Sequence, residues 1–482
     1  MASPAPVYPP PRARRSIAGP VVLILIGLLF LLRNLGVRIP LFYMFAHYWP
    51  VLLILWGLIK LWEYEIARKS GARAAGIGFG GGLLLFLLII FGLSMTGIDR
   101  ARNNINWGEL RDEVQVDNGF MHLFGTDHQY DDQLQQDFPA GSSLKVLCDR
   151  GSVTINSWDQ NQVKVLAHKR IFTSNDRDAD NLNAKTKPVF TTVGNVVQLN
   201  ANTQGGGDAG VRTDLEIYLP LKAMVDITTR RGDVIVNSRD GEVRVSNQRG
   251  DINAENVQGD LNVTVERGSI RASKIQGNIN IQGRANDVVL LDVSGLATLN
   301  GDFFGDMRLS NLARGLRLHT SRTDLEFTQL DGDLDLDSGN LTAKQVSGPF
   351  TLNTRAKDIE LQAVTGDVRI TDDHGDVNVY GAPKIGNVEV NDSHGTIMVA
   401  MPPKTSFQFT GSTRDGDIQS DFKEITVSTS EHGRSTASGT VGKGGPRVQL
   451  TSETGDLEIR RGQPPAPPEP PPVPPAPKAP SK

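Results

Sequence analysis

Apolar residues recur through the second half of the chain with a period of nine residues. From Gly232 onward, each unit opens with a turn residue and places apolar side chains at its third and fifth positions. These pairs are Val234/Val236, Val243/Val245, Ile252/Ala254, Leu261/Val263, Ile270/Ala272, Ile279/Ile281 and Val288/Leu290. Alternation over so short a span is the spacing of a β-strand with one face turned inward. A strand and a turn repeated at a fixed period are typical of a stacked solenoid.

Two of these units make one rung. The dipeptides Arg231-Gly232, Arg249-Gly250 and Arg267-Gly268 recur every 18 residues. A lone apolar residue also precedes every second turn: Val257, Ile275, Val293, Leu312, Leu330, Val346 and Val364. We therefore expect an all-β exported domain, folded as a parallel β-solenoid with about 18 residues per rung. At its corners, Gly and Asn should supply positive φ, and Asp should bond its own turn backbone.

The first hundred residues are apolar enough to enter a membrane. Three segments predict transmembrane helices over residues 17–35, 41–61 and 74–98. Basic residues precede the first segment and lie between the second and third: Arg12, Arg14, Arg15, Lys60, Arg68, Lys69 and Arg73. By the positive-inside rule, the amino terminus is cytoplasmic and the large carboxyl-terminal region lies outside the cytoplasm. We expect a multi-pass protein of a bacterial cytoplasmic membrane, with the lipid bilayer as a partner.

The remaining segments follow from composition and periodicity. The expected order is a Pro/Arg-rich cytoplasmic end (1–16), the three-helix membrane region (17–98), a linker (99–136), a strand-rich amino-terminal cap (137–220), the solenoid (221–400), a carboxyl-terminal cap (401–461) and a Pro-rich disordered tail (462–482). Caps are expected because an open rung exposes unpaired strand edges.

Composition narrows the classes of function. The formal net charge is −4, and no basic stripe carries interleaved aromatic residues, so we expect no nucleic-acid partner. The single cysteine, Cys148, lies in an alternating apolar stretch and should be a buried small side chain. The segment 76–81 matches a dinucleotide fingerprint but neither follows a strand nor opens a soluble helix. We therefore expect no cofactor, no catalytic nucleophile and no enzymatic activity.

Two similar corners carry residues that suggest a metal site. Asp372, Asp373 and His374 precede one glycine, and Asp392 and His394 precede another, 20 residues later. That spacing is close to one rung, so the two histidines should stack on the same edge. Imidazole and carboxylate groups can bind a divalent metal, and paired carboxylates can do acid–base work on a polysaccharide. The alternative is a stack of polar corner residues at a solvent edge.

A second candidate is the acidic run from Asp331 to Asp337, in which aspartates occupy alternate positions. On a strand they would line one outward face, where Ca²⁺ could bind. The calcium β-roll, however, needs several glycines and an aspartate in a set order in every nine residues. An acidic face that discourages edge-to-edge aggregation is the simpler interpretation.

Two resemblances to known families rest on these segments. Residues 16–61, which include Trp49-Pro50, resemble the LiaI–LiaF-like transmembrane region of bacterial envelope-stress proteins. Residues from about 137 to 461 resemble the bacterial "putative adhesin" β-strand repeat domain of unknown function. The residues that carry this likeness are GSVTINSWDQNQVKV at 151–165, DLEIYLP at 214–220, the run of Gly-Asp turns, and the closing Gly455-Asp456-Leu457-Glu458-Ile459. The resemblance implies a β-solenoid in the cell envelope.

Three functions follow as hypotheses. The first is a membrane-anchored binding or scaffold protein of the cell envelope, adhesin-like and non-enzymatic, whose partner is an envelope polymer. The second, which the LiaF resemblance implies, is a regulator of envelope-stress signalling that acts on a membrane signalling protein. The third is a polysaccharide-acting enzyme, which would need the edge of Asp372, Asp373, Asp392, His374 and His394 to form a groove.

Overall fold

The computed structural model describes residues 126–173, 175–206, 210–430 and 433–462, with scattered positions between 50 and 90. The three expected membrane helices lie largely outside the described residues, although the few described positions within them are helical. No helix among the described residues is both long and apolar enough to cross a bilayer. The expected linker up to residue 125 and nearly all of the Pro-rich tail also lie outside the described residues.

The chain divides into two compact units. The smaller unit comprises Met1–His128, Ile171–Leu182 and Gly206–Gly210, and it contains most of helix α6 (Asp176–Lys185). Asn175 caps this helix, because its side-chain oxygen accepts a hydrogen bond from the amide of Asp178 at 2.8 Å. All of the rungs described below belong to the larger unit.

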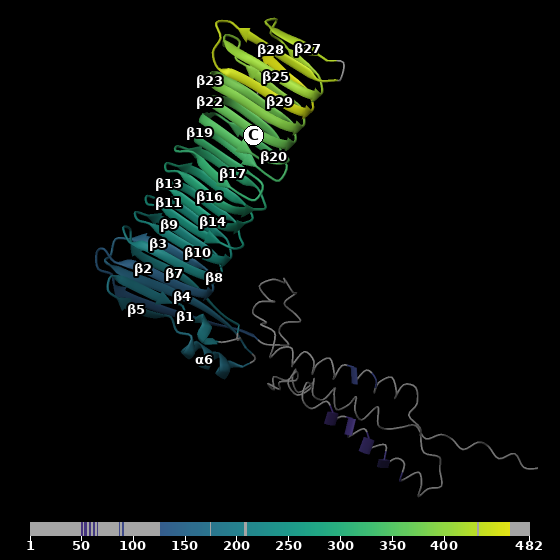
Figure 1. The fold of residues 1–482 in the computed structure, drawn as a ribbon. Helices are drawn as coiled ribbons and strands as arrows, with labels where there is room; N and C mark the ends of the chain where they lie inside the picture. Colours follow the sequence, from purple (N-terminus) through teal and green to yellow (C-terminus); the bar gives the residue numbers. More distant parts are fainter. Residues whose placement is uncertain are drawn as a thin grey trace, which may run out of the picture. The chain divides into compact units, whose positions relative to one another are not determined.

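The larger unit is a stack of two-strand rungs (Figure 1). One strand of each rung belongs to a first row: β8 (Met224–Arg231), β10 (Val243–Arg249), β12 (Leu261–Val265), β14 (Ile279–Ala285), β16 (Ala297–Phe303) and β18 (Leu316–His319). The other belongs to a second row: β9 (Val234–Arg239), β11 (Ile252–Val257), β13 (Ile270–Ile275), β15 (Val288–Val293) and β17 (Met307–Leu312). Strands of successive rungs pair in parallel, as Val243 pairs with Leu261 and Ile252 with Ile270. The predicted 18-residue rung is confirmed.

The alternating apolar residues form one continuous core between the two rows. Val234, Leu261 and Ile279 are fully buried, and Ile252 is 1% exposed. Burying one such side chain stabilises the fold by roughly 1.5–3 kcal/mol relative to leaving it in water. Repetition of this contribution in each rung lets the stack hold together without a disulfide.

The corners differ from the sequence prediction in one respect. The aspartate of a Gly-Asp corner accepts a hydrogen bond from the next rung, as Asp233 does from the amide of Asp251 at 2.9 Å. Asp251 in turn accepts from the amide of Ser269 at 2.8 Å. The prediction that such aspartates bond their own turn is wrong here, because stacking places the equivalent amide of the next rung closer. It holds at Asp337, which accepts from the amides of Gly339 and Asn340.

One strand in the middle of the stack runs in the opposite direction. β19 (Asp324–Leu336) is antiparallel to β17 and β18 on one side and to β20 (Asn340–Lys344) and β21 (Val346–Asn353) on the other. The expectation of a wholly parallel solenoid is wrong for this rung. Two hairpin turns, at residues 320–323 and 337–340, reverse the chain, and an alternating apolar pattern reads the same in both directions.

Parallel stacking resumes after β21. β22 (Asp358–His374) and β23 (Val377–His394) are long enough to contribute to both rows, and β24 (Ile397–Met401) pairs with β23. The last strands are β25 (Phe407–Asp415), β26 (Ile418–Ser420), β27 (Ile425–Thr429), β28 (Ser435–Val441), β29 (Arg447–Thr454) and β30 (Leu457–Arg461). β29 pairs with both β23 and β25, so the last rung in sequence is an internal rung in space. The antiparallel strands β27 and β28 lie beyond β25.

The amino-terminal end of the stack is also built out of sequence order. β2 (Ser143–Arg150) and β3 (Val153–Trp158) lie between β8/β9 on one side and β6 (Val196–Asn200)/β7 (Gly210–Pro220) on the other. The remaining elements here are β1 (Thr126–Asp137), β4 (Gln162–Thr173), β5 (Val189–Val193) and the short 3₁₀ turn Thr203–Gly206. Residues 126–136, which were expected to belong to a linker, form most of β1, because they find a pairing partner in β4.

Candidate functional site

The outward positions of the first row form a continuous line of short polar side chains. Each residue of this line is in register with the next, one from each successive strand or strand segment. We call it the polar row: Ser246, Thr264, Gln282, Asn300, His319, Asp324, Asn353, Thr371, Asn391, Thr451 and Ser412. Most of these side chains are exposed. The strand spacing places a hydroxyl, amide or other polar group about every 4.8 Å along the row.

The predicted stacking of the two histidines is confirmed. His374 and His394 are in register on β22 and β23, and their rings stack with centroids 4.5 Å apart and planes 9° apart. Nδ1 of His394 lies 3.2 Å from the carbonyl oxygen of Asp373. Both rings lie at the exposed edge of the corner.

The aspartates of the same two corners point inward instead. Asp372 and Asp392 are in register, 1% and 4% exposed, and belong to a buried polar line that continues with Ser452 and Thr413. Asp372 accepts hydrogen bonds from the amides of Asp373 and Lys357, at 2.8 and 3.2 Å. Neither carboxylate oxygen of Asp392 has a hydrogen-bond partner within the described chain, and the Ser452 hydroxyl has none either. Thr413 donates to the carbonyl oxygen of Gly455 at 3.0 Å.

Burial changes the acidity of this pair. It raises the pKa of Asp392 to about 6, and the neighbouring charge of Asp372 adds to the effect. The pKa of Asp372 is also raised, mainly by burial. Asp392 is therefore protonated more readily than an exposed aspartate. A polymer substrate could not reach either group, because both lie beneath the surface.

The five residues proposed for metal binding thus separate into exposed and buried sets. His374, His394 and Asp373 lie at the surface or partly exposed, and Asp372 and Asp392 lie inside. Across the described segments of the chain, no three His, Cys, Asp or Glu side chains come together as a metal-ligand group.

The acidic run lies on β19 as an outward row. Asp331, Asp333 and Asp335 are exposed and alternate with buried or half-buried neighbours. Asp335 faces Arg308 of β17 across the antiparallel pair, and Asp331 accepts a hydrogen bond from Gln329 at 2.7 Å. Asp337 leaves this row, and the amides of Gly339 and Asn340 together with the Asn340 side chain lower its pKa. The outward alternation predicted from sequence is confirmed for the strand but not for its last aspartate.

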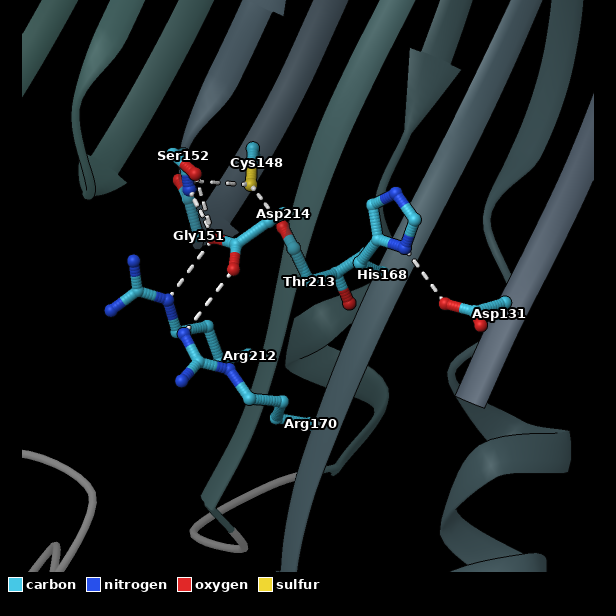
Figure 2. Close-up of polar contacts among 9 residues, drawn as sticks. All are labelled: Asp131, Cys148, Gly151, Ser152, His168, Arg170, Arg212, Thr213 and Asp214. Atoms are coloured by element: carbon cyan, nitrogen blue, oxygen red, sulfur yellow. Dashed lines mark hydrogen bonds and ion pairs between the residues drawn. The ribbon is translucent and has the colours of Figure 1, made fainter. Parts of the chain in front are cut away.

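Cys148 lies in a dense polar network near the amino-terminal end of the stack (Figure 2). Its sulfur is 3.6 Å from the carbonyl oxygens of Gly151 and Thr213, and the side chain is 2% exposed. Burial, aided by the charges of Asp214 and Asp149, raises the pKa of the thiol to about 12. The predicted buried position is confirmed, and such a thiol is a poor nucleophile at neutral pH.

Asp214 of β7 connects its strand to β4 and to the turn between β2 and β3 in the same region (Figure 2). Its Oδ1 accepts hydrogen bonds from the amide and hydroxyl of Ser152, both at 2.8 Å, and from Arg212 at 3.1 Å. Arg170 donates to Oδ2 at 3.3 Å. Burial alone would raise the pKa of Asp214, but these hydrogen bonds and Arg212 lower it. This carboxylate is fully engaged, so its role is to tie the strands together.

Sequence reasoning missed the buried charge of Arg239. Arg239 is fully buried and occupies the position that the lone apolar residue Val257 fills in the next rung. Its guanidinium donates to the carbonyl oxygens of Leu219, Pro220 and Ala223. Burial lowers its pKa to about 10. One signal in the sequence could have found it. Arg239 stands where the following rungs place a lone apolar residue before the turn, and this change marks the junction with the amino-terminal strands.

Comparison with known families gives two matches. Residues 276–460 match the family described as Toastrack DUF4097, and residues 17–61 match the LiaI-LiaF-like transmembrane region. Both resemblances inferred from the residues are therefore confirmed, the first over the carboxyl-terminal part of the predicted range. The two matches together fit a membrane-anchored protein with a Toastrack domain.

Comparison with individual proteins adds little. No curated protein matches the chain in sequence. One solved structure is described as a "putative cell adhesion protein" from Clostridium sporogenes; it shares 9% identity, covers 70% of this chain and 100% of its own, and gives a TM-score of 0.15.

Proposed function

We propose that this protein is a membrane-anchored, non-enzymatic binding or scaffold protein of the bacterial cell envelope. The observation that carries the proposal is the polar row. A line of polar side chains, one per strand or strand segment and most of them exposed hydroxyl or amide groups, is suited to hydrogen bonding along an extended polymer. Each contact contributes only about 0.5–1.5 kcal/mol, but contacts repeated along a row act together through effective concentration.

The membrane end supports the same proposal. A match to a transmembrane region at residues 17–61 fits an anchor that holds the stack at a membrane. In the arrangement we propose, three helices cross the cytoplasmic membrane and the solenoid lies outside the cytoplasm. The envelope polymer is then the ligand nearest to the row.

The test is retention of envelope polymer by the full-length protein in detergent micelles on beads. The variant Asn300→Ala/Asn353→Ala/Thr371→Ala removes three exposed groups from the polar row. We expect about a tenfold loss of retained polymer, because each lost hydrogen bond costs on the order of 0.5–1.5 kcal/mol.

A matched control carries the same three changes on the outward side of the second row. Asn253→Ala/Thr342→Ala/Asn378→Ala alters the same residue types on β11, β20 and β23. This control should retain polymer like the unaltered protein. Equal retention by both variants would overturn the proposal that the polar row is the binding surface.

A second candidate function is regulation of envelope-stress signalling. The match at residues 17–61 to the LiaI-LiaF-like transmembrane region is the observation that favours it. In-cell crosslinking of the full-length protein, followed by mass spectrometry, separates the two functions. Capture of a membrane signalling protein would support the regulator, whereas wall polymer without such a protein would support the scaffold.

A further inference from the structure

One corner of the stack gathers arginines into an open hollow of about 500 Å³. Ten residues from four successive rungs line it: Arg230, Arg231, Gln248, Arg249, Thr264, Val265, Glu266, Arg267, Gly283 and Arg284. Five are arginines and one is a glutamate, so the lining carries a formal charge of 5 − 1 = +4. The whole chain has a formal charge of −4, so this hollow departs sharply from its surroundings.

The repeat itself assembles these charges. Arg231 and Arg249 pair directly in register on β8 and β10, and Arg267 follows at the same 18-residue step. Neighbouring strands are about 4.8 Å apart, so like charges are stacked at a spacing that is unfavourable without a counter-charge. Gly283 also lines the hollow, and a Cβ added to it would lie 1.9 Å from the carbonyl oxygen of Val265, so the two neighbouring rungs approach closely at this point.

Acidic neighbours neutralise only part of this charge. Asp149 pairs with Arg230 at 2.8 Å, and Arg231 and Arg249 each have a polar interaction already. Asp302 lies in register with Arg284, but the Ser321 hydroxyl donates to it at 2.7 Å. Within the described part of the chain, neither the Arg267 nor the Arg284 guanidinium donates a side-chain hydrogen bond or forms an ion pair within 4.0 Å, although the charge of Arg284 acts on Asp302, and both side chains are exposed.

We infer that this arginine hollow binds the oxyanion groups of an anionic polymer. The guanidinium group presents a planar fork of donors that matches a phosphate or carboxylate group bidentately. Arg267 and Arg284 come from neighbouring rungs, which are about 4.8 Å apart along the stack, and this spacing suits adjacent charged groups of one chain. Thr264 lines the hollow and also belongs to the polar row, so one polymer can follow the row and place its charged groups in the hollow.

This inference rests on the proposed binding function for its biological setting, but its chemistry is tested separately. The probes are sodium polyphosphate, polygalacturonate and uncharged dextran, titrated against the full-length protein in detergent micelles by calorimetry. We expect binding of polyphosphate or polygalacturonate that weakens as salt is added, and no binding of dextran at the hollow. Which of the two anionic polymers binds tells whether phosphate or carboxylate groups are recognised.

The decisive variant is Arg267→Gln/Arg284→Gln. We expect it to lose at least about tenfold in affinity for the anionic probe, while its melting temperature stays unchanged because both side chains are exposed. The control Arg308→Gln/Arg369→Gln removes two exposed arginines that pair with Asp306 and Glu389 elsewhere on the stack, and its affinity should stay within about twofold.

A variant that is expected to bind anions more tightly distinguishes loss of the arginine charges from a general loss of binding caused by damage to the fold. Glu266→Gln removes the acidic group that lines the hollow and should strengthen anion binding by a few fold. Equal affinity of the Arg267→Gln/Arg284→Gln variant and the unaltered protein, or binding of neither anionic probe, would overturn the inference. If the Arg267→Gln/Arg284→Gln variant no longer binds the anionic probes but still retains envelope polymer, the proposed scaffold function holds independently of the hollow.

Discussion

At the residue scale, seven corners of the stack contain a non-glycine residue in the left-handed region of backbone conformation. Ser238, Asn256, Lys274, Asp292, Asn311, Gln345 and Ala363 all have φ between 51° and 57°. All of them except Ser238 come immediately before one of the lone apolar residues that precede every second turn, such as Val257. The left-handed backbone is what turns that apolar side chain inward. Asn tolerates this conformation well, whereas a β-branched residue does not.

The first prediction concerns that backbone. Asn256→Val should lower the free energy of unfolding by roughly 2 kcal/mol, because valine is strained at φ 57° and the bond from Asn256 to the Ser238 hydroxyl is lost. Asn253→Val, three residues earlier on the same strand and exposed, is the matched control and should cost far less. The urea midpoint of the full-length protein, followed by circular dichroism, reports both. Similar losses in the two variants would contradict the argument.

The second prediction concerns the buried carboxylate Asp392. Its folded-state pKa of about 6 is above its ordinary value of 3.8, so the folded state holds the proton more tightly. The contribution to stability is therefore complete below about pH 4 and is lost as the pH rises through 6. Asp392→Asn, which imitates the protonated acid, should raise the free energy of unfolding at pH 7.5 by roughly 2 kcal/mol and change little at pH 4.

Melting temperatures at the two pH values check this prediction. The control is Asp373→Asn, which removes an exposed carboxyl group one residue from Asp372 and should leave the pH dependence as it was. An Asp392→Asn protein that loses stability at pH 7.5 would mean that the carboxylate has a counter-charge at that pH.

At the scale of the element, close stacking of corners selects glycine. A Cβ added to Gly250 would lie 2.2 Å from the carbonyl oxygen of Gly232 in the rung before, and φ at Gly250 is 137°. The same contact recurs from Gly268 to Gly250 and from Gly395 to Gly375. The glycines of this corner are therefore required by the neighbouring rung as well as by their own turn.

The third prediction separates these two requirements. Gly250→Ala should lower the free energy of unfolding by about 3 kcal/mol or more, because the backbone carbonyl it meets cannot move without disturbing the strand pairing. Gly141→Ala, at φ 82° with nothing within 4 Å of the added atom, has the backbone cost alone and should lose about 1 kcal/mol. Thermal melting of the two proteins gives the comparison; equal shifts would show that the rung contact contributes nothing.

At the scale of the whole larger unit, the chain does not build its rungs in sequence order. The rung formed by β29 and β30 fits between β23/β24 and β25/β26, so it closes two strand edges at once. The rung of β2 and β3 does the same between β6/β7 and β8/β9. Each end of the stack is therefore held together by an inserted rung, β2/β3 or β29/β30, that pairs with strands distant from it in sequence.

The fourth prediction follows from this locking. A protein that ends after Pro446 lacks an internal rung, so the strands beyond it lose their parallel partners. We expect such a protein to melt at a much lower temperature and to aggregate through its unpaired edges. A protein that ends after Gly462 keeps every described strand and should melt like the full chain. If both shortened proteins melted alike, β29 and β30 would not be holding the stack together.

The sequence by itself determined the inward positions, the rung length and the two resemblances. Apolar alternation and the 18-residue step depend on local chemistry, and nearly every apolar pair they indicated is buried. The stacking of His374 on His394 followed from their 20-residue spacing, which is close to the length of one rung.

Only the tertiary structure decided direction, order and charge environment. A period of two is unchanged on reversal, so Leu330 stays in its apolar column although β19 runs backwards. The order of rungs at the ends depends on contacts across long stretches of sequence, as between Val388 and Val448. Likewise, the burial of Asp392 and the open hollow beside the arginines arise when separate rungs stack, although the 18-residue Arg-Gly repeat already aligned Arg231, Arg249 and Arg267.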